Sequence, residues 1–235
     1  ESYKNPKATF KNNIIGTINI LEAVRILNKN IKVIFSSSDK AYGDLKKKKY
    51  KESDKIQGKF TYDVSKSSAD MIAQTYNKTY KLNIAILRSG NIYGPGDFNI
   101  NRIIPNLIIN TLNYKNIHLR SNGKLRRDYI YVDDVVIAYH KVMKRLNKKN
   151  NLLIYNLGSK ENLNAIEIVK KVYKILNIKN LKPKILNNTT NIELKRQNLD
   201  YSKINKELKW EPLVNFTAGI KKTIEWYKEN KSLFK

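Results

Sequence analysis

Two short apolar runs, each preceded by a stretch with helical periodicity, constrain the fold of this chain more than any other feature. Residues 31–38, "IKVIFSSS", and 83–91, "NIAILRSGN", are apolar and rich in β-branched residues, the composition of parallel strands buried on both faces. Residues 8–28 and 62–80 repeat apolar side chains every three or four positions, which predicts helices. This alternation of helix and strand predicts an α/β layered fold.

The pattern becomes less regular after "YGPGD" at 93–97, a turn cluster. Beyond it we predict helices at 102–112, 163–177, 202–208 and 217–230, and short strands at 117–121, 153–158 and 183–187. Residues 128–146 predict a strand that runs into a helix capped near Asp133 or Asp134. We place a domain boundary near residue 97. Residues 1–97 would form one domain and 98–235 a smaller α/β domain, from which some segments return to the first.

Composition excludes several classes of protein. The 235 residues are 41% hydrophobic, enough for a sizeable core, and contain no cysteine, which excludes disulfides, cysteine zinc sites and a cysteine nucleophile. His118 and His140 have no partner at metal-ligand spacing, so we predict no metal site. No apolar run is long enough to span a membrane, and "ESYKNPKATF" lacks the apolar core of a secretory signal. We therefore expect a cytoplasmic protein.

The formal charge of +26 suggests nucleic acid as a partner, but the distribution of the charge argues against it. A nucleic-acid surface concentrates its cations and uses arginine for forked contacts, whereas here the lysines are spread through every predicted element. The one basic run, "LKKKKYK" at 45–51, lies in a predicted loop. We do not expect nucleic acid as a partner.

Tyr62 and Lys66 form the pattern Y-x-x-x-K at the start of the predicted helix 62–80. Residues four apart share one face of a helix, so the ammonium would lie close to the phenol. A nearby positive charge favours phenolate and lowers a tyrosine pKa from about 10 toward neutral pH. The pattern suits a general base that removes a proton from an alcohol.

The spacing does not identify the site by itself, because the chain contains the pattern at four places. These are Tyr3/Lys7, Tyr42/Lys46, Tyr62/Lys66 and Tyr227/Lys231. Of these, Tyr62/Lys66 opens a predicted helix, follows a strand that ends in serines, and precedes another buried strand. This context selects Tyr62/Lys66.

Five motifs together resemble the extended short-chain dehydrogenase/reductase superfamily. They are "FSSSDKAYGD", "YDVSKSSAD", "LRSGNIYGPGD", "RIIP" and "RRDYIYVDDV". Within the superfamily they resemble the NAD-dependent epimerase/dehydratase family of nucleotide-sugar enzymes, and most of all CDP-glucose 4,6-dehydratase. The resemblance implies a Rossmann-type NAD-binding domain joined to a smaller domain that binds the nucleotide sugar.

The resemblance implies catalytic roles for three residues. Ser38 would position the sugar O4, Tyr62 would remove its proton while hydride leaves C4 for NAD, and Lys66 would promote the phenolate and hold the nicotinamide ribose. Asn13, in "FKNNIIGT", matches an asparagine of the family near the active site and is a cofactor-binding candidate.

The resemblance also implies a set of substrate contacts. Asn91 would lie beside the sugar diphosphate, and three arginines would meet its phosphates through forked donors: Arg102, Arg127 and Arg196. Of the neighbours Arg126 and Arg127, only one needs to reach the ligand. Arg88, within a predicted buried strand, is expected to pair with an acid.

Asp39 and Lys40 are the residues that distinguish 4,6-dehydratases from 4-epimerases within the resembled family. Relatives acting on dTDP-glucose carry Thr-Asp-Glu where this chain has Ser38-Asp39-Lys40, CDP-glucose 4,6-dehydratases carry an Asp-Lys pair, and simple 4-epimerases usually carry no acid/base pair. Loss of water across C5–C6 needs a base at C5 and an acid at the C6 hydroxyl, and the two residues could divide these tasks. As neighbours on an extended segment, they would point to opposite sides.

The nine glycines form no glycine-rich dinucleotide motif. The resemblance therefore implies a partial Rossmann-type sheet whose first strands are missing, an N-terminally truncated piece of a longer enzyme. Two alternatives to a 4,6-dehydratase stay open: a nucleotide-sugar 4-epimerase, and a non-catalytic fragment or basic binding module. The resemblance also implies a homodimer, paired through helix 8–28 and the helix that bears Tyr62.

Overall fold

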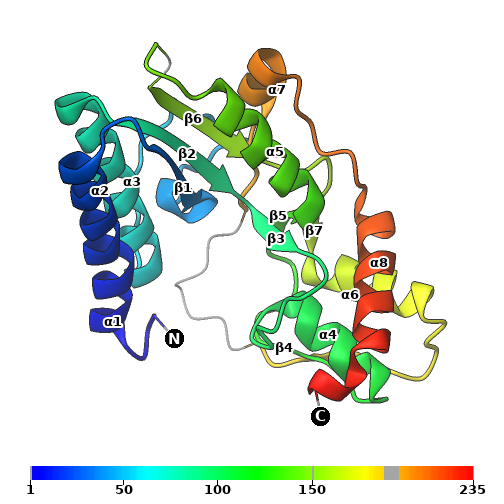
Figure 1. Cartoon of the computed structure of the whole chain (residues 1–235). Coiled ribbons are helices and arrows are strands. Elements are labelled where there is room, and N and C mark those ends of the chain that lie inside the picture. The colour runs from blue at the N-terminus through cyan, green and yellow to red at the C-terminus, as the bar shows by residue number, and fades with distance from the viewer. Residues whose placement is uncertain (1, 150, 188–195, 235) are drawn as a thin grey trace. The chain divides into compact units, whose positions relative to one another are not determined.

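The computed structural model describes residues 2–149, 151–187 and 196–234, and the chain divides into two compact units (Figure 1). Unit 1 comprises Glu1–Gly90, Val135–Gly158 and Asn198–Glu211. Unit 2 comprises Asn91–Asp134, Ser159–Gln197 and Pro212–Lys235. Each unit is thus assembled from segments that are distant in the sequence.

Unit 1 is built on a parallel sheet with strand order β1-β2-β6. The strands are β1 (Lys32–Ser38), β2 (Asn83–Ser89) and β6 (Leu152–Leu157). Every residue of the central strand β2 is buried, as the apolar run Ile84–Leu87 at its centre predicts. Ser38 and Ser89 are register partners at the carboxyl end of the sheet. The predicted α/β class with a Rossmann-type parallel sheet is confirmed.

One face of this sheet is covered by two helical segments. The first runs through α1 (Pro6–Phe10), a π-helical turn at Lys11–Ile15 and α2 (Gly16–Leu27). The second is α3 (Thr61–Tyr80). Leu21 and Val24 of α2 and Ala73 of α3 form one core cluster with Ile84 and Ile86 of β2. The helices predicted at 8–28 and 62–80 are confirmed, whereas the π-helical turn was not predicted.

The opposite face of the sheet carries α7 (Ser202–Leu208). Ile154 packs into the cluster with α2 and α3, so its strand neighbour Tyr155 projects from the other face, where its hydroxyl donates to Glu207 of α7 at 2.5 Å.

The helix predicted within residues 128–146 begins near Asp133 and Asp134, as expected, but Asp134 does not cap it. This helix, α5 (Val132–Arg145), begins at Val132, so Asp133 and Asp134 lie in its first turn. The buried Asp134 carboxylate accepts hydrogen bonds from the backbone N–H groups of Leu213 and Val214, at 3.0 and 3.1 Å. It fixes a distant loop of unit 2 rather than the helix end.

In its described residues, unit 2 has two small sheets, and three helices lie wholly within it around its own core. One sheet has the order β3-β5-β7, and the other pairs β4 with β8. The strands are β3 (Asn91–Tyr93), β4 (His118–Leu119), β5 (Arg126–Tyr131), β7 (Asn162–Asn164) and β8 (Lys184–Ile185). The helices are α4 (Ile103–Leu112), α6 (Ala165–Ile175) and α8 (Phe216–Glu229). Their core cluster includes Leu107, Val172 and Ile220.

The strand predicted over residues 83–91 is two strands in different sheets. β2 ends at Ser89, and Asn91 opens β3 in unit 2. The Gly90 N–H donates to the carbonyl of Leu157, the last residue of β6, at 3.2 Å, and this bond closes the ladder. Asn91 therefore belongs to the second unit. In the described part of the chain, no helix has the length and apolar character needed to cross a membrane.

Candidate active site

Ser38 caps a short helix at the carboxyl end of β1. The 3-10 helix Asp39–Tyr42 begins directly after Ser38, whose hydroxyl oxygen accepts from the Lys40 N–H at 3.2 Å and whose hydroxyl donates to Asp39 Oδ1 at 3.0 Å. Side-chain capping of this kind satisfies backbone donors at a helix start. The expectation that Asp39 and Lys40 lie on an extended segment is wrong, because the chain turns at the end of the strand.

Asp39 is buried within this turn while Lys40 is half-buried. The Asp39 side chain is 2% exposed, and its Oδ2 has no hydrogen-bond partner among the described residues. A buried carboxylate oxygen without a partner is costly, and such groups are found where a ligand or a transferred proton completes them. The turn thus holds one acid and one base next to Ser38.

Gly43 ends the 3-10 helix in a conformation that favours glycine. Its φ is 63° and its ψ is −147°, and a Cβ at this position would lie 2.2 Å from the Gln57 carbonyl oxygen. The Gln57 N–H donates to the Ala41 carbonyl at 3.1 Å. The segment that leads into α3 is therefore packed directly against the turn that carries Asp39 and Lys40.

Tyr62 and Lys66 lie in the first two turns of α3. Tyr62 is 37% exposed, and the Lys66 Nζ lies 6.0 Å from the centre of its ring. Lys66 also donates to the Ser36 carbonyl of β1 at 3.1 Å. Burial lowers the pKa of the Lys66 amine. The structure thus brings the start of α3 to the end of β1, where Ser38 lies.

Asn13 contacts the same turn of α3 from the π-helical turn. Its Nδ2 donates to Ser65 Oγ at 2.9 Å, and Ser65 Oγ donates to the Tyr62 carbonyl at 2.7 Å. π-helical turns inside helices are frequent at functional sites. Ser65 is fully buried and was not among the predicted site residues. The signal that could have found it is its place three residues after Tyr62, within hydrogen-bond reach on a helix.

Arg88 forms the ion pair expected from its place in a buried strand. Its Nε donates to Asp70 Oδ2 at 2.9 Å, and the two side chains are 1% and 0% exposed. Although burial opposes its charge, the hydrogen bonds and charge of Asp70 raise the pKa of Arg88 well above its ordinary value. Asp70 was not among the residues that the sequence singled out, yet it lies four residues after Lys66 on α3.

In unit 2, Asn91 and Arg127 lie on neighbouring strands. Asn91 is the register partner of Tyr129, which is two residues beyond Arg127 and so projects from the same face of β5. Arg127 is 9% exposed, and the one hydrogen bond that its side chain makes among the described residues goes to the Arg126 carbonyl at 2.8 Å. Its guanidinium retains donors for a further acceptor.

The other two predicted arginines have different surroundings. Arg196 is exposed and pairs along the backbone with Arg126, which itself forms an ion pair with Glu167 at 2.9 Å. Arg102 is the N-cap residue of α4 and forms an ion pair with Asp97 at 3.2 Å. Within residues 2–149, 151–187 and 196–234, no three histidine, aspartate or glutamate side chains gather as metal ligands would.

Comparison with known proteins identifies relatives over nearly the whole chain. The family model described as GDP-mannose 4,6 dehydratase matches residues 1–223. A trifunctional UDP-glucose 4,6-dehydratase/UDP-4-keto-6-deoxy-D-glucose 3,5-epimerase/UDP-4-keto-L-rhamnose-reductase of Arabidopsis thaliana is 30% identical over 97% of this chain. The match covers 34% of that plant protein, so the chain spans about a third of its length.

Two solved structures resemble the fold closely. The dTDP-glucose 4,6-dehydratase from Bacillus anthracis in complex with NAD matches with a TM-score of 0.85 and 30% identity, over 95% of this chain and 70% of that one. The UDP-glucose 4-epimerase from Thermotoga maritima with UDP-glucose matches with a TM-score of 0.85 and 28% identity, over 98% and 74%. On the family match and the sequence identity together, the chain belongs to the GDP-mannose 4,6 dehydratase family of nucleotide-sugar enzymes.

Proposed function

We propose that this chain carries the catalytic residues of an NAD-dependent nucleotide-sugar 4,6-dehydratase, most similar to CDP-glucose 4,6-dehydratase. The observation that carries the proposal is the turn at the end of β1, which joins Ser38 to a buried acid, Asp39, and a base, Lys40, next to the helix of Tyr62 and Lys66. A 4-epimerase needs Ser38, Tyr62 and Lys66, whereas loss of water also needs the acid and the base.

The residues of unit 1 fit a nicotinamide cofactor. Lys66 uses one of its three N–H donors on Ser36, so its ammonium can also donate to ribose hydroxyls. Tyr62 and Asn13 are the other cofactor contacts we propose, Asn13 through the side-chain oxygen that its bond to Ser65 leaves available. The chemistry that bound NAD supplies is reversible hydride transfer, from C4 at the start of the reaction and to C6 at its end.

The first step assigned to the protein is removal of the O4 proton. Ser38 holds O4, and the Tyr62 phenolate accepts its proton as C4 is oxidised to a ketone. The cation of Lys66 beside the ring favours the phenolate. The ketone at C4 then acidifies the proton on C5.

The second step is loss of water across C5–C6. Asp39 and Lys40 divide its two proton transfers, one accepting the C5 proton and the other giving a proton to the C6 hydroxyl, which leaves as water. C6 is then reduced and C5 is protonated again. The O4 proton and the C6 hydroxide together make the water that is lost. C4 is oxidised and C6 is reduced by the same hydride, so the overall reaction needs no external oxidant or reductant.

The nucleotide diphosphate would be bound by Asn91, Arg102, Arg127 and Arg196, the residues of unit 2 that the family resemblance selects. Arg127 supports this best, since it is almost buried and has no carboxylate partner among the described residues. A buried guanidinium without a counter-charge is the arrangement expected of a phosphate ligand. Residues 1–97, apart from Asn91, would accordingly serve the cofactor and the catalytic steps, and most of 98–235 the nucleotide sugar.

The experiment that tests the function is a product assay. The protein is incubated with NAD and, in separate reactions, CDP-glucose, UDP-glucose and dTDP-glucose, and products are identified by mass spectrometry and NMR. A 4-keto-6-deoxy sugar formed fastest from CDP-glucose supports the proposal. If the same product formed fastest from UDP-glucose or dTDP-glucose, the proposed reaction would be supported. The proposed preference for a cytidine nucleotide would be overturned.

A 4-epimerase is the second candidate, favoured by the likeness to the Thermotoga UDP-glucose 4-epimerase. The same assay separates the two activities, because an epimerase returns the galactose epimer with no loss of mass. CDP-galactose as the sole product would overturn the dehydratase proposal.

We also propose a homodimer through α2 and α3. Both helices carry exposed apolar side chains, among them Ile20 at 60%, Ile26 at 67% and Met71 at 55%. Exposed apolar groups concentrated on neighbouring helices are typical of a protein interface. Light scattering of the wild type and of Ile20→Glu/Met71→Glu tests the interface, and equal masses for the two would count against it.

A further inference from the structure

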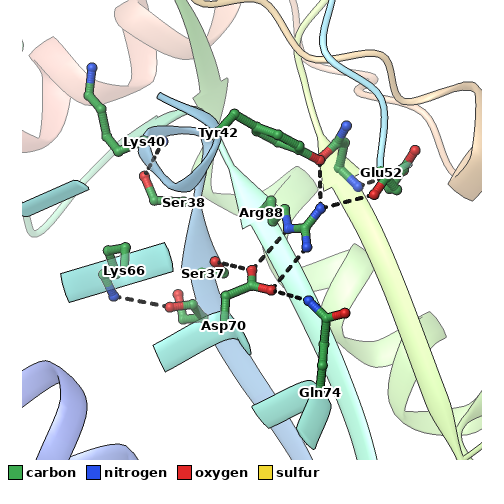
Figure 2. A network of polar contacts seen from close by, with 11 residues as sticks. Ser37, Ser38, Lys40, Tyr42, Glu52, Lys66, Asp70, Gln74 and Arg88 are labelled. Atoms are coloured by element: carbon green, nitrogen blue, oxygen red, sulfur yellow. Dashed lines mark hydrogen bonds and ion pairs between the residues drawn. The ribbon is translucent and has the colours of Figure 1, made fainter. Parts of the chain in front are cut away.

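Asp70 and Arg88 form the centre of a buried polar network that the proposed mechanism does not use (Figure 2). The Asp70 carboxylate accepts two hydrogen bonds from Arg88, each at 2.9 Å, one from Ser37 at 2.6 Å and one from Gln74 at 2.8 Å. Four hydrogen bonds therefore satisfy this carboxylate, and both members of the pair are shielded from water.

The network contacts the two segments that lead to the candidate catalytic groups. Ser37 directly precedes Ser38, and its hydroxyl is bonded to Asp70 of α3. Arg88 Nη1 donates to the Tyr42 hydroxyl at 2.9 Å, and Tyr42 is the last residue of the 3-10 helix that holds Asp39 and Lys40. Figure 2 shows these bonds converging from β1, α3 and β2 onto one carboxylate and one guanidinium.

The far side of the network is anchored in the sheet. The Tyr42 hydroxyl donates to Asn156 Oδ1 of β6 at 2.7 Å, and Arg88 Nη1 also donates to the Glu52 carbonyl at 3.2 Å. Strand β6, the 3-10 helix and α3 are thus joined through side chains. Each of these elements would keep its backbone hydrogen bonds without them.

A gain in stability does not explain why the ion pair Asp70–Arg88 is buried. Removing two charges from water costs about as much as their attraction returns, and well-packed apolar replacements are often neutral or stabilising. What a satisfied buried network does supply is one defined geometry, since moving any member leaves a polar group without its partner.

We propose that the Asp70–Arg88 pair positions the catalytic groups, by fixing Ser38, Asp39 and Lys40 on the β1 side against Tyr62 and Lys66 on α3. The proposal rests on the proposed function, and neither residue is assigned a contact with substrate or cofactor. The network has two branches. The Ser37 branch holds the strand end next to Ser38, and the Tyr42 branch holds the turn of Asp39 and Lys40.

Substitutions that remove one branch at a time test the positioning role, and a substitution elsewhere in the network is their matched control. Ser37→Ala removes the first branch and Tyr42→Phe the second, while Gln74→Met removes a hydrogen bond to the same carboxylate that leads to no catalytic segment. We expect Gln74→Met to retain wild-type kcat. Misplacement by about 1 Å can reduce rates by roughly 100-fold. We expect Ser37→Ala to slow C4 oxidation and Tyr42→Phe to slow water loss more than oxidation, both with little change in KM.

Melting temperatures separate positioning from stability. The double variant Asp70→Leu/Arg88→Met is expected to melt close to the wild type and to lose about 100-fold in kcat. If Ser37→Ala and Tyr42→Phe were as active as Gln74→Met at matched stability, the positioning role would be overturned.

A further measurement needs no turnover and separates this inference from the proposed reaction. NMR of ring-labelled tyrosine, with Tyr62→Phe for assignment, follows the titration of the Tyr62 phenol in the free protein. We expect its midpoint to rise in Asp70→Leu/Arg88→Met, because the strand end that carries the Ser36 carbonyl no longer holds Lys66 in place. An unchanged midpoint would overturn the inference even in an active dehydratase, and a raised one would support it even if no dehydration occurred.

Discussion

The Lys66 ammonium nitrogen lies 6.0 Å from the centre of the Tyr62 ring and donates a hydrogen bond to the Ser36 carbonyl at 3.1 Å. Lys66 and Tyr62 belong to α3 and Ser36 to β1, so one side chain connects the proposed base to the strand that ends in Ser38. The field of the cation therefore acts on the phenol from a fixed place rather than from a freely moving side chain.

Lys66→Met removes this cation. Because the phenolate then loses its positive neighbour, we expect kcat to fall by about 10²- to 10⁴-fold and the pH of half-maximal activity to rise. Steady-state rates measured from pH 6 to 10 check both effects. Lys78→Met, at an exposed lysine in the last turn of the same helix, is the control and should behave as the wild type. An unchanged pH profile in Lys66→Met would remove Lys66 from the mechanism.

Asp39→Asn/Lys40→Met removes the proposed acid and base while the Ser38 hydroxyl and the Tyr62/Lys66 pair remain. We expect water loss to be blocked more strongly than C4 oxidation, so that reduced nicotinamide accumulates in a single turnover. Stopped-flow absorbance of the reduced nicotinamide measures this accumulation. If the double variant formed the 4-keto-6-deoxy product at the wild-type rate, the argument for a dehydratase would lose its main support.

Local patterns could predict the elements that carry the site but not the path of the chain between them. The strand at 31–38 and the helix at 62–80 follow from apolar spacing, which depends on neighbouring residues alone. The break at Gly90 does not, because the switch to another sheet depends on where β6 ends. The turn at Asp39 depends on the hydrogen bond from the Lys40 N–H to the Ser38 hydroxyl. This bond forms only when the chain has already turned at the end of β1.

The supporting residues of the site were harder to predict than its candidate catalytic residues. Tyr62 and Ser38 have roles that the family motifs assign. Ser65 and Asp70 lie in the same motif as Tyr62, "YDVSKSSAD", but as buried polar residues of α3 they had no assigned role. A buried arginine in strand 83–91 indicated that an acid must lie nearby, but the choice of Asp70 depended on the packing of α3 against the sheet.

Asn13→Ala and Ser65→Ala test the hydrogen bonds from the π-helical turn to the Tyr62 carbonyl. Each should reduce kcat, since the first turn of α3 loses one of its fixed contacts, and a buried polar group left without its partner costs roughly 1–3 kcal/mol. Because Asn13 reaches the Tyr62 carbonyl only through Ser65, the double variant should be little worse than Asn13→Ala alone, which also loses the proposed cofactor contact. Fully additive effects in a double-mutant cycle would show that Asn13 acts independently of Ser65.

Burial raises the pKa of Tyr42 to about 12 and outweighs the opposing effect of Arg88. The unfolded chain loses this proton near pH 10 and the folded chain keeps it. The contribution of Tyr42 to the free energy of unfolding therefore falls as pH rises from about 10 to 12, by roughly 2–3 kcal/mol. Urea unfolding across this range measures the slope. We expect Tyr42→Phe to be less stable than the wild type at pH 8. Above pH 10, its free energy of unfolding should fall less steeply with pH. Tyr114→Phe, at an exposed tyrosine, should keep the wild-type slope.

Gly43 and Gly96 both have positive φ, 63° and 75°, but differ in the space around them. A Cβ at Gly43 would lie 2.2 Å from the Gln57 carbonyl oxygen, whereas none of the described atoms lies within 4 Å of one at Gly96. We expect Gly96→Ala to cost on the order of 1 kcal/mol from backbone strain alone. Gly43→Ala should lower the free energy of unfolding by roughly 3 kcal/mol or more, because the new Cβ adds a clash with the Gln57 backbone to the same backbone strain.

The clash at Gly43 should also displace the candidate site, because the Gln57 segment is packed against the turn of Asp39 and Lys40. We therefore expect Gly43→Ala to reduce kcat at temperatures where it is still folded, and Gly96→Ala to leave kcat unchanged. Denaturant unfolding and activity assays of the two variants side by side measure both effects. Equal stability and activity for the two would mean that the Gln57 segment yields easily, and that Gly43 does not fix the geometry of the turn.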